Sequence, residues 1–162
     1  MPHTKALRDQ LATFIDFGEA HATADDAMAD LELELQGTRP KGVKHSPWEL
    51  LEHIRLTQHD ILDFCVNSQY ETLEWPAEYW PKAAAPPDAA AWKTSVASFR
   101  ADRDALRALA TDASRTDLFS AIPHGDGQTY LRELLLAQDH LSYHTGQLIL
   151  VRQMLGAWHP DK

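Results

Sequence analysis

Hydrophobic positions recur at steps of three and four residues in four stretches of the chain, the spacing of one face of an α-helix. The first stretch runs from Lys5 to about Gln36, with acidic residues between its apolar positions, and Gly37 is expected to end it. No stretch alternates apolar and polar residues as a half-buried β-strand does. The pattern therefore predicts an all-α protein.

The second helix has the best-marked start. Ser46 supplies an N-cap, Pro47 occupies the first helical position, and Glu49 lies three residues after the cap. This is a capping box with proline where its missing N–H does no harm. An apolar face then continues to about Asn67.

Residues 68–90 differ in composition from the helices around them. Four of the nine prolines lie here, beside Trp75, Tyr79 and Trp80. Flexible linkers seldom carry large aromatic side chains, so an ordered loop is expected. These three aromatics either form the wall of a small-molecule pocket over one end of the helices or simply pack as a loop on the core.

Two more helices follow this loop. The third is expected from a candidate cap at Asp88 to near Asp112, and the fourth from about Thr129 to Leu155. Four amphipathic helices, each ~30–45 Å long, in 162 residues predict a single domain over residues 1–162. The expected fold is an antiparallel four-helix bundle with a long aromatic, proline-rich loop between the second and third helices.

Composition excludes several classes of function. The net charge is −9 and no basic cluster offsets it, which disfavours binding to nucleic acid or to an anionic membrane. The longest apolar runs are about four residues, too short to span a bilayer, and the N-terminus lacks a signal-peptide core, so a cytoplasmic location is expected. The single cysteine, Cys65, excludes an internal disulfide and a multi-cysteine zinc site, and a buried thiol is expected.

The nine histidines are the feature that points to chemistry. His140 and His144 lie one helical turn apart and interrupt the apolar row of Leu136, Leu148 and Val151. Both rings should therefore face the interior, where an unpaired polar group costs roughly 1–3 kcal/mol. They are either metal ligands or side chains satisfied by ordinary protein partners.

A third ligand is available on the second helix. His53 lies near the border of the apolar face there, and three imidazoles from facing helices suit Zn²⁺, Ni²⁺ or Fe²⁺ with positions left for water. His21 is the one serious rival. The poorer candidates are His59, on a different helical face, His45 and His124, before helix starts, and His3 and His159, near the termini.

Two segments resemble the DinB-like family of bacterial metalloproteins: HSPWELLEHI (45–54) and GQTYLRELLLAQDHLSYHTGQLILVRQMLGAW (127–158). The stretches EWPAEYWPK and PHGDGQT are also similar to members of that family. The resemblance implies a four-helix bundle in up-down-down-up order, often dimeric. It also implies a metal triad of one histidine on the second helix and an HxxxH pair on the last, here His53, His140 and His144.

For activity, the resemblance implies a range rather than one reaction. The family includes thiol-dependent enzymes, among them a maleylpyruvate isomerase and S-transferases, and others resemble metal-dependent hydrolases. The expectation is a metal-dependent enzyme that acts on a small molecule or a low-molecular-weight thiol and forms a homodimer. Gln147, one turn beyond His144, either orients a ligand or water or makes an ordinary hydrogen bond between helices. The alternative is a non-catalytic, metal-stabilised module for dimerisation or binding.

Overall fold

The computed structural model describes residues 2–17, 20–29 and 31–158, which form helices joined by loops. Its helices are α1 (Pro2–Phe17), α2 (Ala24–Met28), α3 (Leu33–Gln36), α4 (Pro47–Val66), α5 (Ala91–Thr111) and α6 (Tyr130–Met154). Extended pairing in the described residues is limited to an isolated bridge between Ala121 and Thr129. The predicted all-α class is confirmed. None of the described helices is long and apolar enough to cross a membrane.

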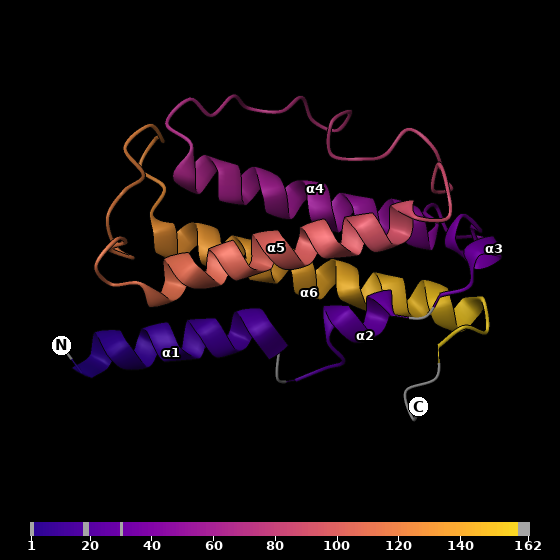
Figure 1. The fold of residues 1–162 in the computed structure, drawn as a ribbon, viewed down its shortest axis with the longest axis horizontal. Helices are drawn as coiled ribbons and strands as arrows, with labels where there is room; N and C mark the ends of the chain where they lie inside the picture. The colour runs from indigo at the N-terminus through magenta and orange to yellow at the C-terminus, as the bar shows by residue number, and fades with distance from the viewer. Residues whose placement is uncertain (1, 18–19, 30, 159–162) are drawn as a thin grey trace.

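The four long helices lie side by side (Figure 1). α1 and α6 run in one direction along the molecule, and α4 and α5 run in the other. α4 packs against both α5 and α6, while α1 packs against α5. Residues 67–90, here called the strap, return along the length of α4 and so allow α4 and α5 to point the same way (Figure 1).

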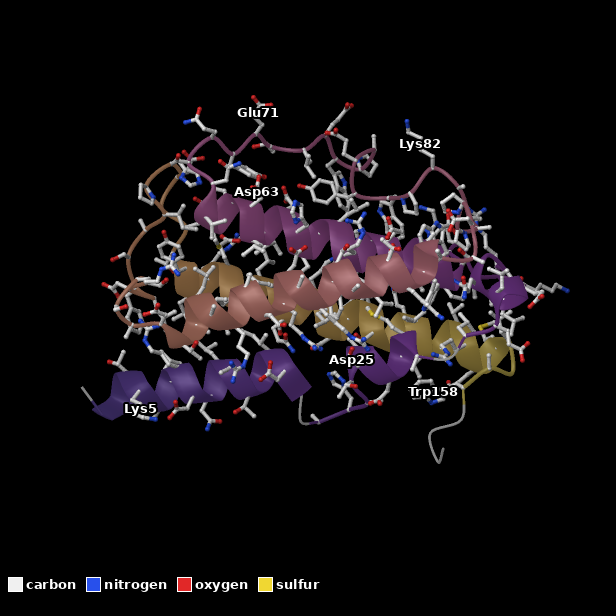
Figure 2. All side chains as sticks on the ribbon, in the orientation of Figure 1. Lys5, Asp25, Asp63, Glu71, Lys82 and Trp158 are labelled. Atoms are coloured by element: carbon white, nitrogen blue, oxygen red, sulfur yellow. The ribbon has the colours of Figure 1, made fainter. Side chains whose placement is uncertain are left out.

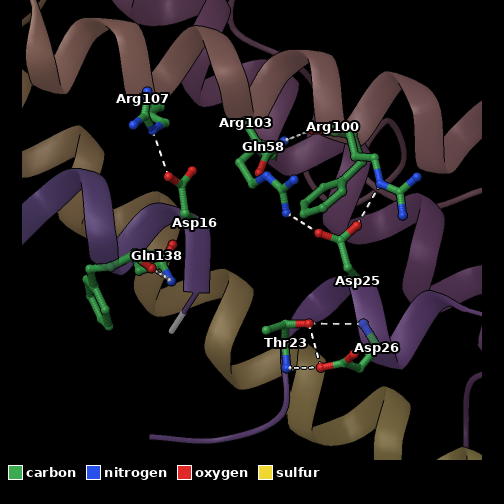
Figure 3. Close-up of polar contacts among 11 residues, drawn as sticks. Asp16, Thr23, Asp25, Asp26, Gln58, Arg100, Arg103, Arg107 and Gln138 are labelled. Atoms are coloured by element: carbon green, nitrogen blue, oxygen red, sulfur yellow. Dashed lines mark hydrogen bonds and ion pairs between the residues drawn. The ribbon is translucent and has the colours of Figure 1, made fainter. Parts of the chain in front are cut away.

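The prediction of one helix from Lys5 to Gln36 is wrong, because α1, α2 and α3 divide this stretch. Thr23 has an extended backbone, and its hydroxyl accepts a hydrogen bond from the Asp26 N–H at 3.0 Å. The Asp26 carboxylate accepts the Thr23 N–H at 2.9 Å in return (Figure 3). This capping box starts a new helix at Ala24. The T-x-x-D spacing that forms it is present in the sequence and could have indicated the break.

The other predicted helix ends have the expected chemistry. Ser46 and Glu49 form the reciprocal capping box at the start of α4. The Asp88 carboxylate accepts hydrogen bonds from the N–H groups of Ala90 and Ala91 at the start of α5. The N-cap residue is Ala90, two residues after Asp88. Thr129 caps α6, and Gly156 has a φ of 69°, the left-handed conformation expected just past the end of that helix.

Ion pairs hold α1 and α2 against α5. The Asp25 carboxylate accepts hydrogen bonds from Arg100 at 2.6 Å and from Arg103 at 2.5 Å, and Asp16 pairs with Arg107 at 2.7 Å (Figure 3). Burial acts to raise the pKa of Asp25, but the two arginines outweigh it and hold that pKa below its usual value. The break between α1 and α2 is thus fixed by opposite charges on the neighbouring helix.

Arg152 joins the end of α6 to the end of α2. Its side chain is 5% exposed and donates to the carbonyl oxygens of Ala27 at 2.7 Å and Ala29 at 2.6 Å. Its Nε also donates to the carbonyl of Ala157 at 3.1 Å. A single guanidinium therefore satisfies the carbonyls that the short helix α2 leaves unpaired at its C-terminal end.

The apolar interior falls into two clusters along the helices. One includes Leu50, Leu51, Ile54, Phe99 and Leu148, and the other includes Leu11, Ile15, Leu62, Leu106 and Leu134. Cys65 is buried, as expected, and burial raises the pKa of its thiol to about 12. The thiol is therefore protonated near neutral pH.

Replacing Arg152 with methionine should lower the free energy of unfolding by about 3 kcal/mol, because several buried carbonyls lose their donor. Urea unfolding followed by circular dichroism measures the change. The matched control is Arg100→Met, since Arg100 is half-exposed and Asp25 keeps Arg103; its expected cost is below about 1 kcal/mol. Equal costs for the two variants would contradict the assigned role of Arg152.

Candidate metal centre

The structure brings together the three histidines expected to form a metal site. His53 lies on α4, and His140 and His144 lie on α6. One ring nitrogen from each can be chosen so that all three lie within 4.8 Å of one another. The described residues hold no second group of three histidine, cysteine, aspartate or glutamate side chains with this closeness.

Helix packing explains why the rings meet. His140 and His144 occupy neighbouring turns of the α6 face that packs on α4, and their ring centroids are 4.4 Å apart. His53 projects from α4 into the same place, with its centroid 4.8 Å from His140 and 4.5 Å from His144. His53 and His144 are 2% and 7% exposed, so the cluster is an interior feature.

Hydrogen bonds to the outer nitrogens fix how two of the rings are oriented. His53 Nδ1 lies 2.7 Å from the carbonyl oxygen of Tyr79, and His144 Nδ1 lies 2.8 Å from Gln147 Oε1. Both oxygens accept, so Nδ1 carries the proton in each ring. Each Nε2 then has a free lone pair, the form of histidine that binds a metal. Gln147 thus hydrogen-bonds to His144 on its own helix, rather than across to another helix.

The donor set fits a divalent transition metal. His140 Nε2 lies 3.1 Å from His53 Nε2. Two nitrogens that each lie ~2.1 Å from one ion are about 3.0 Å apart at a right angle and about 3.4 Å apart at the tetrahedral angle. The observed separation suits either a shared ion or, without one, a hydrogen bond between the rings. Three close histidines can therefore hold a metal ion here.

Burial keeps these imidazoles neutral. It lowers the pKa of His53 to about 4, against the opposing effect of the Tyr79 carbonyl, and lowers the pKa of His140 to about 3. It also lowers the pKa of His144. Metal ligation requires neutral imidazole, so at neutral pH no proton has to leave these rings first.

Trp80, on the strap, covers the His53 ring. Its indole stacks on His53 with centroids 3.8 Å apart and planes 6° apart, and it also stacks on His45 at 4.0 Å. Burial lowers the pKa of His45 too, and this side chain is near enough to influence His53 electrostatically. His45 is a poor candidate by its sequence position, since it precedes a helix, and no motif marks its packing on Trp80.

Two exposed aromatic rings lie beside the buried cluster. Trp75 is 67% exposed and has its centroid 6.4 Å from His53, and Tyr143 is 64% exposed and meets His144 edge-on at 4.8 Å. Trp75 and Tyr79 also contact each other, with centroids 5.3 Å apart. The strap aromatics lie along α4 beside the histidines, rather than over one end of the helices as predicted. Trp80 packs on the apolar core, which was one of the two expectations for these aromatics.

His21, His59 and His124 lie apart from the cluster. His21, the rival ligand, is exposed and hydrogen-bonds to the neighbouring Ala22 carbonyl. His59 is exposed beside Asp102, and His124 bonds to the carbonyl of Phe64. His159 and the side chain of His3 lie outside the described residues.

The lowered pKa values predict that metal-free protein loses stability in acid. An unshifted histidine has a pKa of 6.5, so the unfolded chain binds more protons than the folded one as the pH falls from about 6.5 to about 4. The free energy of unfolding should decrease over that range. Urea midpoints measured in chelator test this, and His140→Leu should show a shallower pH dependence. The same slope in both proteins would contradict the prediction.

The sequence of the chain matches that of a known protein family. The model of the DinB superfamily matches residues 16–148, a range that contains all three clustered histidines. Comparisons with curated proteins and with solved structures gave no match. Because the family model spans most of the chain, the chain belongs to the DinB superfamily.

Proposed function

We propose that this protein binds one divalent cation, Zn²⁺, Ni²⁺ or Fe²⁺, through His53, His140 and His144, and uses it in an enzymatic reaction on a small molecule. The reaction is of the thiol-transfer or hydrolytic type. The observation that best supports this is the hydrogen bonding of two outer nitrogens, which leaves the Nε2 atoms of His53 and His144 unprotonated beside His140. A closed structural zinc site usually has four protein ligands, whereas this group has three.

In the proposed reaction, residues of the chain orient the ligand rings and contact the substrate. Tyr79 and Gln147 hold two of the ligand rings in the required tautomer. Trp75 and Tyr143 offer exposed aromatic surface to a substrate next to the histidines. A bound divalent cation supplies acidity, since it lowers the pKa of a coordinated water or thiol toward neutrality.

The family supplies the remaining parts of the proposal. We take the four long helices as the up-down-down-up four-helix bundle of the superfamily. If the reaction is thiol transfer, the proposed co-substrate is a low-molecular-weight thiol. A homodimer and a cytoplasmic location stay predictions from the sequence.

Metal analysis of the purified protein tests the ligand assignment. We expect about one divalent ion per chain in the unmodified protein and a loss of at least tenfold in affinity for His144→Ala. His59→Ala is the matched control, because His59 is exposed and belongs to α4 but not to the cluster; its metal content should not change. Unchanged metal content in His144→Ala would remove the proposal.

Removing the metal with a chelator distinguishes a catalytic metal site from the alternative, a non-catalytic module that the metal stabilises. An open catalytic site should leave a folded metal-free protein, whereas a structural ion makes the fold collapse when it is removed. We expect the helical circular dichroism signal to survive chelator, and thermal unfolding to shift back upward when Zn²⁺ is restored. Activity screens with thiols, esters and amides then follow on the loaded protein. Loss of helical signal with chelator would favour the non-catalytic module.

A further inference from the structure

The strap is fastened to one face of α4 at three regularly spaced points. These are Ser46, the cap of the helix, His53 and Asp60, each seven residues after the one before. Seven residues fall within about 20° of two full helical turns, so all three side chains share a face. Figure 2 shows the strap running beside α4, with Glu71 and Lys82 directed away from that helix.

The three points bind Ala84 and Tyr79 of the strap. Ser46 Oγ donates to the carbonyl of Ala84 at 2.5 Å. His53 Nδ1 donates to the carbonyl of Tyr79 at 2.7 Å. Asp60 accepts the Tyr79 hydroxyl at 2.8 Å through one carboxylate oxygen. The strap is therefore antiparallel to α4.

Tyr79 is the residue that α4 holds twice. Its carbonyl receives the proton of His53, and its hydroxyl is held by Asp60, seven residues further along the helix. Burial and the bond to Asp60 raise the pKa of the Tyr79 hydroxyl, so the phenol stays protonated and donates. The two bonds together fix the position of the carbonyl that His53 must reach.

Stacking on Trp80 cannot replace the carbonyl of Tyr79. The parallel rings hold the plane of the His53 imidazole. A half-turn about its Cβ–Cγ bond would keep that plane and exchange Nδ1 with a ring carbon, which would also move Nε2 away from His140. The hydrogen bond to Tyr79 selects the orientation in which Nε2 points at the other two histidines.

We propose that Asp60 is a positioning residue for the metal centre and acts through Tyr79. By holding the Tyr79 hydroxyl, it places the carbonyl that sets the tautomer and the orientation of His53. Asp60 is not a ligand, since the group of close donor atoms consists of the three histidines. The proposal rests on the proposed function only in so far as it assigns His53 to a metal.

A matched pair of tyrosine variants tests this link. Tyr70 also donates to Asp60, at 2.9 Å, and its hydroxyl is near enough to that of Tyr79 to influence it. Within the described residues, however, Tyr70 makes no hydrogen bond to a histidine of the cluster. Tyr79→Phe removes the link and keeps the carbonyl, whereas Tyr70→Phe removes an equivalent phenol from the same carboxylate. We expect Co²⁺ affinity, measured by competition with a chelator, to fall about tenfold in Tyr79→Phe and less than twofold in Tyr70→Phe.

The Asp60→Ala variant completes a double-mutant cycle. It should weaken Co²⁺ binding about as much as Tyr79→Phe does, and the double variant should be no weaker than either, because both changes break one link. Thermal unfolding of each metal-free variant shows whether it is folded. Additive losses in the double variant, or equal losses in Tyr70→Phe and Tyr79→Phe, would overturn the proposal.

A second measurement needs no metal. In ¹⁵N spectra of histidine-labelled, metal-free protein, His53 should carry its proton on Nδ1, and Tyr79→Phe should convert it to a mixture of tautomers while Tyr70→Phe does not. An unchanged tautomer in Tyr79→Phe would overturn the positioning role. If the unmodified protein failed to bind Co²⁺, the proposed function would fall, while the tautomer comparison would still decide the role of Asp60.

Discussion

The enclosure of three imidazoles between α4 and α6, those of His53 and His144 buried and that of His140 partly buried, is the constraint on which the site depends. A buried polar atom without a partner costs about 1–3 kcal/mol, so each ring nitrogen has to be accounted for. The Tyr79 carbonyl and Gln147 satisfy the outer nitrogens of His53 and His144, and the inner nitrogens face one another. Burial also lowers the pKa values of the rings and keeps them neutral. The arrangement that satisfies the outer nitrogens of His53 and His144 is thus also the one that suits a cation.

The long helices and the strap contribute differently to this cluster. The helices fix the backbone positions of the three rings, because α4 and α6 pack directly on each other. The strap adds the carbonyl of Tyr79 and the indole of Trp80, which determine how the His53 ring is turned. A loop with few backbone partners of its own is held by side chains of α4. The position of the strap and the orientation of the His53 ring therefore depend on each other.

Several features could be predicted because they depend on short-range chemistry. The Ser46–Glu49 capping box, the cap at Thr129 and the left-handed Gly156 each involve neighbouring residues, and all three are present. The break after α1 was missed although its capping box at Thr23 is equally local, because the apolar periodicity on either side continues across it. The role of His45 had no local signal, since its partner Trp80 is far along the chain.

By itself the sequence determined the helical class, most helix ends and the one-turn spacing of His140 and His144, since each follows from residues within a few positions of one another. It also placed His53 near an apolar face and so made it a candidate. Only the tertiary structure decided that His53 meets the other two and that His21 does not, because that depends on which helices pack together. It alone decided which nitrogen of His53 carries a proton, since the acceptor comes from a separate segment of the chain.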